Sequence, residues 1–294
     1  MSINDRVLVW LWPPLGAAAA VALLEEMRAD TVHKKLQFQV EYAAIDGQGS
    51  SDSNSVLDRI TDSSGRFHRI PRPTSAIPTQ RNSTLHSSYE AIENLKAVIR
   101  FAKTLCCDKV FTCETGNDMA QQVLNSVALG RGCQLPDLTG LSVERDGITL
   151  LRPMREFCDE EVGKYLTSRN LPVPAAPKLS TGIQKLTRDF VNGLHADFPS
   201  TAPTIWRTAD KISVTSGTVF CDLCGCRLLA AGKPQSSSSS LTNGRLPPQA
   251  ETELAGAMEA LRVSAQLSTT LTIAEDRGDM DQRCYACRQM IVAR

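Results

Sequence analysis

Two pairs of cysteines near the C-terminus carry the clearest chemistry in this sequence. Cys221 and Cys224 form one C-x-x-C pair, and Cys284 and Cys287 form the other. Two such pairs supply the four thiolates that a tetrahedral structural zinc requires. An iron–sulfur cluster is the alternative because thiolates hold it too, whereas a redox role is less favoured because neither pair opens a thioredoxin-like unit. We therefore predict a metal site at these four cysteines, with Cys226 as a spare thiol.

The turn from Trp12 to Ala17 lies where a nucleotide-binding protein would hold phosphates. Residues 7–11 are predicted to form a buried strand and residues 17–35 a helix. A phosphate-binding turn uses glycines so that backbone N–H groups can approach the anion. This turn instead contains Pro13 and Pro14, which have no N–H to offer. We predict a plain strand–helix connection, and we do not expect this chain to bind ATP productively.

The segment from Cys113 to Gly132 has a position typical of a ligand site. It follows a predicted strand and opens a helix, and ligands bind at that edge of open α/β sheets. Its residues are equally those of a capped helix, with Asn117 or Asp118 as the N-cap, and physical reasoning alone favours the capped helix. No Ser/His/Asp triad is apparent in the sequence.

Several arginines are candidates for contacts with RNA phosphates. The formal net charge is zero, so an RNA contact requires a local patch rather than the charge of the whole chain. A basic stretch between residues 59 and 81 lies in a predicted loop, where a solvated surface is the alternative. Arg152 and Arg155 follow a predicted strand, where salt bridges are the alternative. The candidates are Arg59, Arg66, Arg69, Arg72, Arg131, Arg152 and Arg155.

Strands that alternate with helices predict an α/β fold, a parallel sheet flanked by helices. We expect this domain over residues 1–170, with a flexible insertion at 46–87. Residues 178–294 are predicted to be a helical region that carries the cysteine pairs, with a flexible serine-rich part at 231–250. The apolar run at 7–24 would pass for a secretory signal, but Pro13 and Pro14 break a spanning helix. The clustered cysteines are typical of a cytosolic metalloprotein, so no membrane association is expected.

Taken together, these motifs resemble the cytoplasmic tRNA 2-thiolation protein 2 family. The resemblance extends in order over nearly the whole chain, which makes it more specific than any single motif. It rests on residues 113–132, 134–136, 151–155, 198–201 and 206–208, and on the pairs Cys221-x-x-Cys224 and Cys284-Tyr285-x-Cys287-Arg288.

The resemblance implies an adenine-nucleotide α-hydrolase-like fold in a degenerate form. Active relatives carry Ser-Gly-Gly-x-Asp-Ser on the first strand–helix turn, adenylate a uridine oxygen and then replace it with sulfur. Residues Trp12, Pro13, Pro14, Gly16 and Ala17 stand at the Ser, Gly, Gly, Asp and Ser positions of that motif. Of the acidic nucleotide-loop motif, only Asp118 is retained. No catalytic residue therefore carries over, and only the four paired cysteines transfer, as metal ligands.

The resemblance further implies an accessory, non-catalytic subunit of a tRNA sulfurtransferase complex. The family pairs with a catalytic subunit 1 as a heterodimer and serves 2-thiolation of the wobble uridine in cytosolic tRNAs for Lys, Glu and Gln. The product is 5-methoxycarbonylmethyl-2-thiouridine. The sulfur comes from a thiocarboxylated ubiquitin-related modifier, the carrier of the protein urmylation pathway.

Two alternatives come from other functional classes. One is a self-sufficient ATP-dependent tRNA sulfurtransferase, and the other is a zinc-stabilised interaction module without an RNA role. The sequence also departs from the family at its start, because relatives usually carry a cysteine knuckle before the first strand and this chain reaches that strand by Val7. A truncated sequence and a true loss are the two interpretations, and either puts a metal site built from N-terminal cysteines in doubt.

Overall fold

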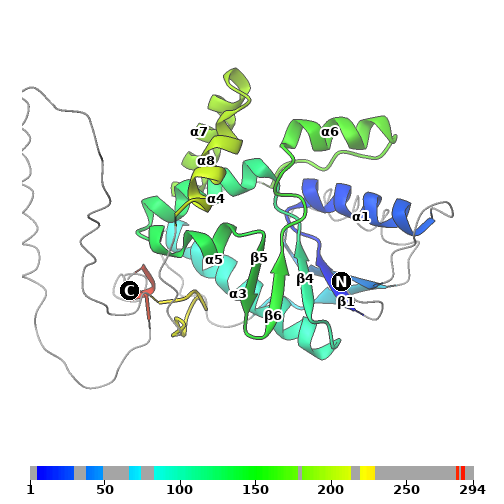
Figure 1. The fold of residues 1–294 in the computed structure, drawn as a ribbon, viewed down its shortest axis with the longest axis horizontal. Coiled ribbons are helices and arrows are strands. Elements are labelled where there is room, and N and C mark those ends of the chain that lie inside the picture. Colours follow the sequence, from blue (N-terminus) through cyan, green and yellow to red (C-terminus); the bar gives the residue numbers. More distant parts are fainter. Residues whose placement is uncertain are drawn as a thin grey trace, which may run out of the picture. The chain divides into compact units, whose positions relative to one another are not determined.

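A computed structural model describes the body of the chain (Figure 1). The residues described are 5–29, 38–48, 66–73, 83–177, 181–212, 219–228, 283–284 and 286–288. Residues 1–230 and 283–294 belong to one compact unit, which contains all of these ranges. Among the described residues, no helix is both long and apolar enough to span a membrane.

The centre of the fold is a six-stranded, mostly parallel sheet in the order β3-β2-β1-β4-β6-β5. Its strands are β1 (Arg6–Trp10), β2 (Gln39–Ile45), β3 (Phe67–Ile70), β4 (Lys109–Thr112), β5 (Ser142–Arg145) and β6 (Ile148–Leu151). Only β5 is antiparallel, because it forms a hairpin with β6. The predicted α/β class with a parallel sheet is therefore confirmed.

Helices cover both faces of this sheet (Figure 1). The helices of the described residues are α1 (Pro14–Ala29), α3 (Ser83–Thr104), α4 (Gly116–Ala128), η1 (Gly132–Gln134), α5 (Leu135–Thr139), α6 (Asp159–Ser168), α7 (Ile183–Asp197) and α8 (Thr201–Asp210). Val7 and Val9 of β1 pack with α1 and α6, whereas Leu8 and Trp10 pack with α3. This alternation follows from the two-residue period of a strand, and it explains why β1 is apolar on both faces.

The C-terminal helices α7 and α8 pack against α4, which begins directly after the central strand β4. Trp206 of α8 and Met119 of α4 share one apolar cluster, and Val191 of α7 shares another with Ala120. The residues on both sides of the predicted boundary at 170–178 thus lie in the same compact unit.

The predicted flexible insertion at 46–87 requires a correction in two places. Phe67–Ile70 forms the edge strand β3, paired in parallel register with β2 from Tyr42 to Ile45. Residues 83–87 already belong to α3. A four-residue strand is too short to show a clear hydrophobic alternation, so the order of β3 comes from its pairing with β2 rather than from its own pattern. The remainder of the insertion, from 49 to 65 and from 74 to 82, and the predicted flexible stretch at 231–250 lie outside the described residues.

Candidate functional site

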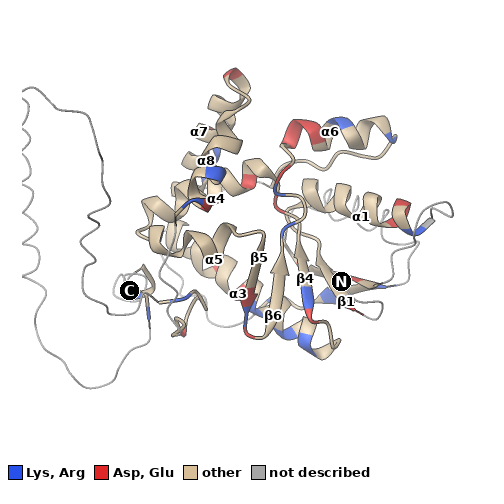
Figure 2. Cartoon of the chain, in the orientation of Figure 1, with Lys and Arg blue, Asp and Glu red and all other residues tan. Residues whose placement is uncertain are grey.

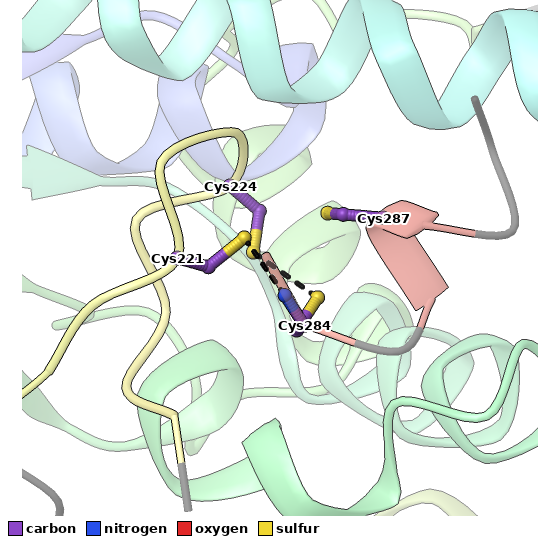
Figure 3. A group of neighbouring side chains, drawn as sticks. All are labelled: Cys221, Cys224, Cys284 and Cys287. Carbon is purple, nitrogen blue, oxygen red and sulfur yellow. Dashed lines mark hydrogen bonds between the residues drawn. The ribbon is translucent and has the colours of Figure 1, made fainter. Parts of the chain in front are cut away.

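The four predicted cysteines come together in space (Figure 3). Cys221 and Cys224 lie on one turn after α8, and Cys284 and Cys287 come from the short C-terminal segment. Their sulfur atoms all lie within 4.8 Å of one another, and Cys224 Sγ and Cys284 Sγ are 3.8 Å apart. All four side chains are buried. The structure therefore assembles the predicted set, although 60 residues separate Cys224 from Cys284.

Backbone hydrogen bonds shape the first cysteine pair into a tight turn. Cys221 N–H donates to Cys226 O and Gly225 N–H donates to Cys221 O, both at 2.8 Å. Gly225 has a φ of 68°, a left-handed conformation that glycine adopts without strain. The second pair is linked to this turn, because Cys284 N–H donates to Cys221 Sγ at 3.3 Å. Both pairs therefore present their sulfur atoms to one point.

The pKa shifts of the four thiols show how closely their sulfur atoms interact. Hydrogen bonds from Cys224, Cys284 and Cys287 hold the pKa of Cys221 far below the usual thiol value. The pKa values of the three donors are raised, mainly because they hydrogen-bond to Cys221. Protons alone thus favour a single thiolate within the group. A divalent cation would hold all four sulfur atoms as thiolates, which are the ligand form of cysteine.

A fifth thiol, Cys226, lies beside this group. Arg145 Nη2 donates to Cys226 Sγ at 3.1 Å, and both side chains are buried. A hydrogen bond from Cys224 lowers the pKa of Cys226, and the charge of Arg145 lowers it further. Arg145 was missed at the level of sequence. Its position follows from the β5–β6 hairpin, whose Asp146-Gly147 turn, with φ values of 52° and 76°, is a recognisable hairpin signal.

The turn between β1 and α1 is closed by backbone packing. A Cβ placed on Gly16 would lie 1.9 Å from Cys113 O, at the end of the neighbouring strand β4. Glycine is needed here so that α1 can approach the backbone that follows β4, not so that a phosphate can approach. Ala17 N–H donates to Pro13 O at 3.0 Å, so this N–H group already has an acceptor.

A cavity of about 610 Å³ lies over the carboxyl ends of the parallel strands. Trp10 and Thr112 line it from the last residues of β1 and β4, and Arg152 lines it from the position after β6. Ligands of open α/β sheets bind at this edge. The volume falls within the range of ordinary small-molecule sites, which is about 300–1,000 Å³.

Next to this cavity, two carboxyl groups share one hydroxyl group. Thr115 Oγ1 lies 3.1 Å from Asp118 Oδ2 and 2.5 Å from Asp159 Oδ1. Burial, together with the charge of Asp159, raises the pKa of Asp118 to about 7. Thr115, not Asn117 or Asp118 as predicted, is the N-cap of α4. Asp118 instead completes a capping box by accepting from Thr115 N–H, and Asn117 Oδ1 accepts from Asp159 N–H at the start of α6.

The arginines after β6 are buried rather than exposed to solvent. Arg155 is 4% exposed, donates to Thr139 O, forms an ion pair with Asp210 and stacks over the Trp206 ring. It joins α8 to the sheet through these contacts, which fit the salt-bridge alternative, and its contact with RNA stays a prediction. Arg152 is 5% exposed and donates to Gly140 O. Burial lowers the pKa of Arg152, and the nearby charge of Glu114 opposes that shift.

The remaining candidate arginines differ in their surroundings, and Figure 2 marks where Lys and Arg lie along the ribbon. Arg69 lies in the edge strand β3, and Arg66 and Arg72 flank it; Arg69 pairs with Asp46 and Arg72 pairs with Glu90. Arg69 and Arg72 are at least half exposed. Arg131 is half-buried after α4, where its N–H donates to Ser126 O. Arg59 lies outside the described residues. The group on β3 is therefore the part of the predicted set that presents basic side chains on one edge.

The family model and the curated relatives that match this chain carry the same description. Residues 182–289 match a family model described as cytoplasmic tRNA 2-thiolation protein 2. The chain is similar to cytoplasmic tRNA 2-thiolation protein 2-A of Xenopus laevis, at 31% identity over 192 residues, 57% of this chain and 38% of that protein. It is also similar to cytoplasmic tRNA 2-thiolation protein 2 of Drosophila virilis, at 25% identity over 94% of this chain and 76% of that protein. This chain thus spans less than half the length of the Xenopus relative.

One solved structure shares the fold at low sequence identity. It is the U34-tRNA thiolase NcsA from Methanococcus maripaludis with its [4Fe-4S] cluster. The TM-score is 0.58 at 12% identity, and the match covers 77% of this chain and 78% of that chain. The similarity confirms the predicted fold class and concerns the fold alone.

Proposed function

We propose that this chain belongs to the cytoplasmic tRNA 2-thiolation protein 2 family and acts in the cytoplasm as the accessory subunit of a tRNA-thiolating complex. The observation that carries the accessory role is the turn from Trp12 to Ala17. The two prolines remove N–H donors from the turn. The backbone carbonyl of Cys113 occupies the space next to Gly16. A chain with this turn is suited to complete a complex whose ATP chemistry takes place on a catalytic partner subunit.

The proposed substrate is the wobble uridine of cytosolic tRNAs for Lys, Glu and Gln. In this proposal the chain forms a heterodimer with catalytic subunit 1, contributes to the binding of tRNA and works with a thiocarboxylated ubiquitin-related modifier as the source of sulfur. Support comes from the match to this family and from a sheet of the same fold as a U34-tRNA thiolase.

We propose a single zinc ion at Cys221, Cys224, Cys284 and Cys287. Around zinc with Zn–S bonds of about 2.3 Å, tetrahedral sulfur ligands lie about 3.8 Å apart. The separation of 3.8 Å between Cys224 Sγ and Cys284 Sγ, and the 4.8 Å limit for the whole set, fit this geometry. An iron–sulfur cluster inserts its own iron atoms between the thiolates and so requires them to lie farther apart. The compact spacing therefore favours one ion with a structural role.

The direct test of the function is a measurement of tRNA thiolation. Deletion of the gene is expected to abolish most 2-thiouridine in bulk tRNA, and expression of this chain is expected to restore it. Mass spectrometry of tRNA nucleosides measures both, with pseudouridine as the internal control. Unchanged 2-thiouridine in the deletion strain would refute the role in thiolation and leave the zinc-stabilised interaction module. ATP turnover by the isolated chain would refute the accessory role and favour a self-sufficient sulfurtransferase.

The basic edge at β3 gives a separate prediction. We expect weaker tRNA binding, by about tenfold at 0.1 M salt, when Arg59, Arg66, Arg69 and Arg72 are replaced by Glu. The variant would neutralise fewer phosphates, so its binding would release fewer counterions from the tRNA. The salt dependence of the affinity should fall by about one unit of slope for each phosphate that the protein no longer neutralises. Fluorescence anisotropy of the complex with labelled tRNA measures both quantities.

The control is Lys164→Glu, which reverses one exposed charge on α6 rather than beside β3. It should leave both the affinity and the salt slope close to those of the wild type. If the quadruple variant binds tRNA as tightly as the control at low salt, the edge is an ordinary solvated surface.

A further inference from the structure

The cavity over the strand ends has a lining that the proposed accessory role does not use. It contains three arginines and three carboxylates, so its formal charges balance: Glu90, Glu114, Asp118, Arg145, Arg152 and Arg188. A phosphate site would show an excess of donors and positive charge. The balanced lining instead suits a neutral group that both donates and accepts hydrogen bonds.

Several buried polar groups in this lining have no hydrogen-bond partner among the described residues. Thr112 Oγ1, Glu114 Oε2 and Arg152 Nε are buried without such a partner. Asn94 on α3 lines the cavity and is 5% exposed, and its amide makes no hydrogen bond with another described residue. A buried polar group without a partner costs about 1–3 kcal/mol, so native structures rarely retain several in one place without a ligand or water. Together these residues place an amide in the cavity wall and a hydroxyl, an acceptor and a donor at or just behind it.

The remaining lining adds aromatic and amide side chains. Trp10 and Trp12 line the cavity where β1 ends. Six side-chain amides also line it; those of Gln48, Gln121, Asn125 and Gln184 already bond to other residues, which leaves Asn94 and Gln122. Unstacked bases of RNA are recognised by stacking on aromatic rings and by hydrogen bonds to their polar edges. Amides are suited to those edges because each carries both a donor and an acceptor.

We propose that this cavity binds an unstacked nucleobase presented by single-stranded RNA. Asn94 and Thr112 hydrogen-bond to the base edge, and Trp12 provides an apolar wall. The inference deepens the proposed role in tRNA thiolation and rests on it only for the source of the base. It assigns this chain a base pocket of its own, separate from any active site on a catalytic partner.

The test compares two short single-stranded RNAs that differ at one position, where the second carries an abasic site. Affinities for the full-length, metal-loaded chain are measured by fluorescence anisotropy at fixed salt, so that phosphate contacts remain equal. We expect the intact RNA to bind about tenfold more tightly, which is the order of one stacked and hydrogen-bonded base. Equal affinities for the two RNAs would overturn the proposal.

Two variants identify the cavity as the site. Asn94→Leu and Thr112→Val replace unpartnered polar groups with apolar groups of similar size, so they should leave the stability unchanged or raised. Each should bring the affinity for intact RNA close to that for abasic RNA. Gln39→Leu removes an exposed amide at the start of β2, outside the cavity, and should bind as the wild type does. If both cavity variants prefer intact over abasic RNA as strongly as the wild type does, the base binds elsewhere and the cavity is not its site.

Two further outcomes separate the sources of the base and the two proposals. Free uridine or ATP that binds as tightly as the RNA, with the same loss in Asn94→Leu, supports the base pocket and assigns it to a free nucleotide. The wild-type chain could prefer the intact RNA in the binding assay while deletion of its gene leaves 2-thiouridine unchanged. That pair of results supports the pocket and refutes only the role in thiolation. A wild-type chain that shows no base preference but restores 2-thiouridine refutes the pocket and leaves the role in thiolation standing.

Discussion

Replacing Cys221 and Cys224 together with serine is expected to remove the metal and to release the C-terminal segment from the body of the protein. Two thiolates would remain, and two sulfur ligands do not complete a tetrahedral zinc site. The binding free energy of a structural zinc is largely folding free energy, on the order of 10 kcal/mol in small zinc domains at neutral pH. The variant should therefore lose more stability than any single substitution in the apolar core, for which about 2–5 kcal/mol is usual.

Elemental analysis of the purified full-length chain measures this effect, together with limited proteolysis of the C-terminal segment. We expect about one zinc per wild-type chain, the stoichiometry of a four-cysteine site, and almost none in the variant. Cys106→Ser is the matched control, since Cys106 is an exposed free cysteine outside the group of four. A wild-type chain without zinc or iron, or a double variant that retains its metal, would contradict the assignment.

Asp118→Asn is expected to stabilise the protein at pH 8 and to flatten its dependence on pH. The Asp118 carboxyl group is held against Asp159 through Thr115, and its pKa is raised from 3.8 to about 7. Between these two values the folded protein retains a proton that the unfolded chain has released. Stability is therefore highest below pH 3.8 as far as this group is concerned, and it falls as the pH rises towards 7.

The full effect above pH 7 is about 4 kcal/mol, at about 1.4 kcal/mol for each unit of pKa shift. Asparagine removes the charge and keeps an oxygen that accepts from Thr115 N–H, so the cap of α4 remains. Urea unfolding between pH 4 and pH 8 measures the difference, and Asp197→Asn at an exposed position is the control. If Asp118→Asn is less stable than the wild type at pH 8, the carboxylate is stabilising and its assigned pKa shift is wrong.

Both experiments concern contacts that join distant parts of the chain, which is where prediction from sequence was weakest. The metal ligands were predicted because C-x-x-C spacing is itself a chemical requirement. The role of Thr115 was missed because Asn117 and Asp118 are equally good caps by residue type. Only the packing of α6 against the start of α4, through Asn117 and Asp159, decided which residue caps the helix.

The arginines follow the same division. Their charge and position after predicted strands suggested phosphate contacts for Arg152 and Arg155 alike. In the structure Arg155 is buried against Trp206 and Asp210, which belong to a helix about 50 residues later in the chain. A charge pattern does not reveal burial, because burial depends on which distant element packs over the side chain.

The sequence by itself determined the class of the fold, the identity of the clustered cysteines and the loss of N–H donors at Pro13 and Pro14. These follow from local periodicity and residue chemistry, which need no long-range contact. Only the tertiary structure decided that the two cysteine pairs meet and that the carbonyl of Cys113 lies against Gly16. It also decided that a cavity with balanced formal charge lies over the strand ends. The cavity and the contact at Gly16 arise from the parallel register of strands far apart in the chain, and a local pattern does not specify that register. The cysteine pairs meet because two segments 60 residues apart pack together, which no local pattern specifies either.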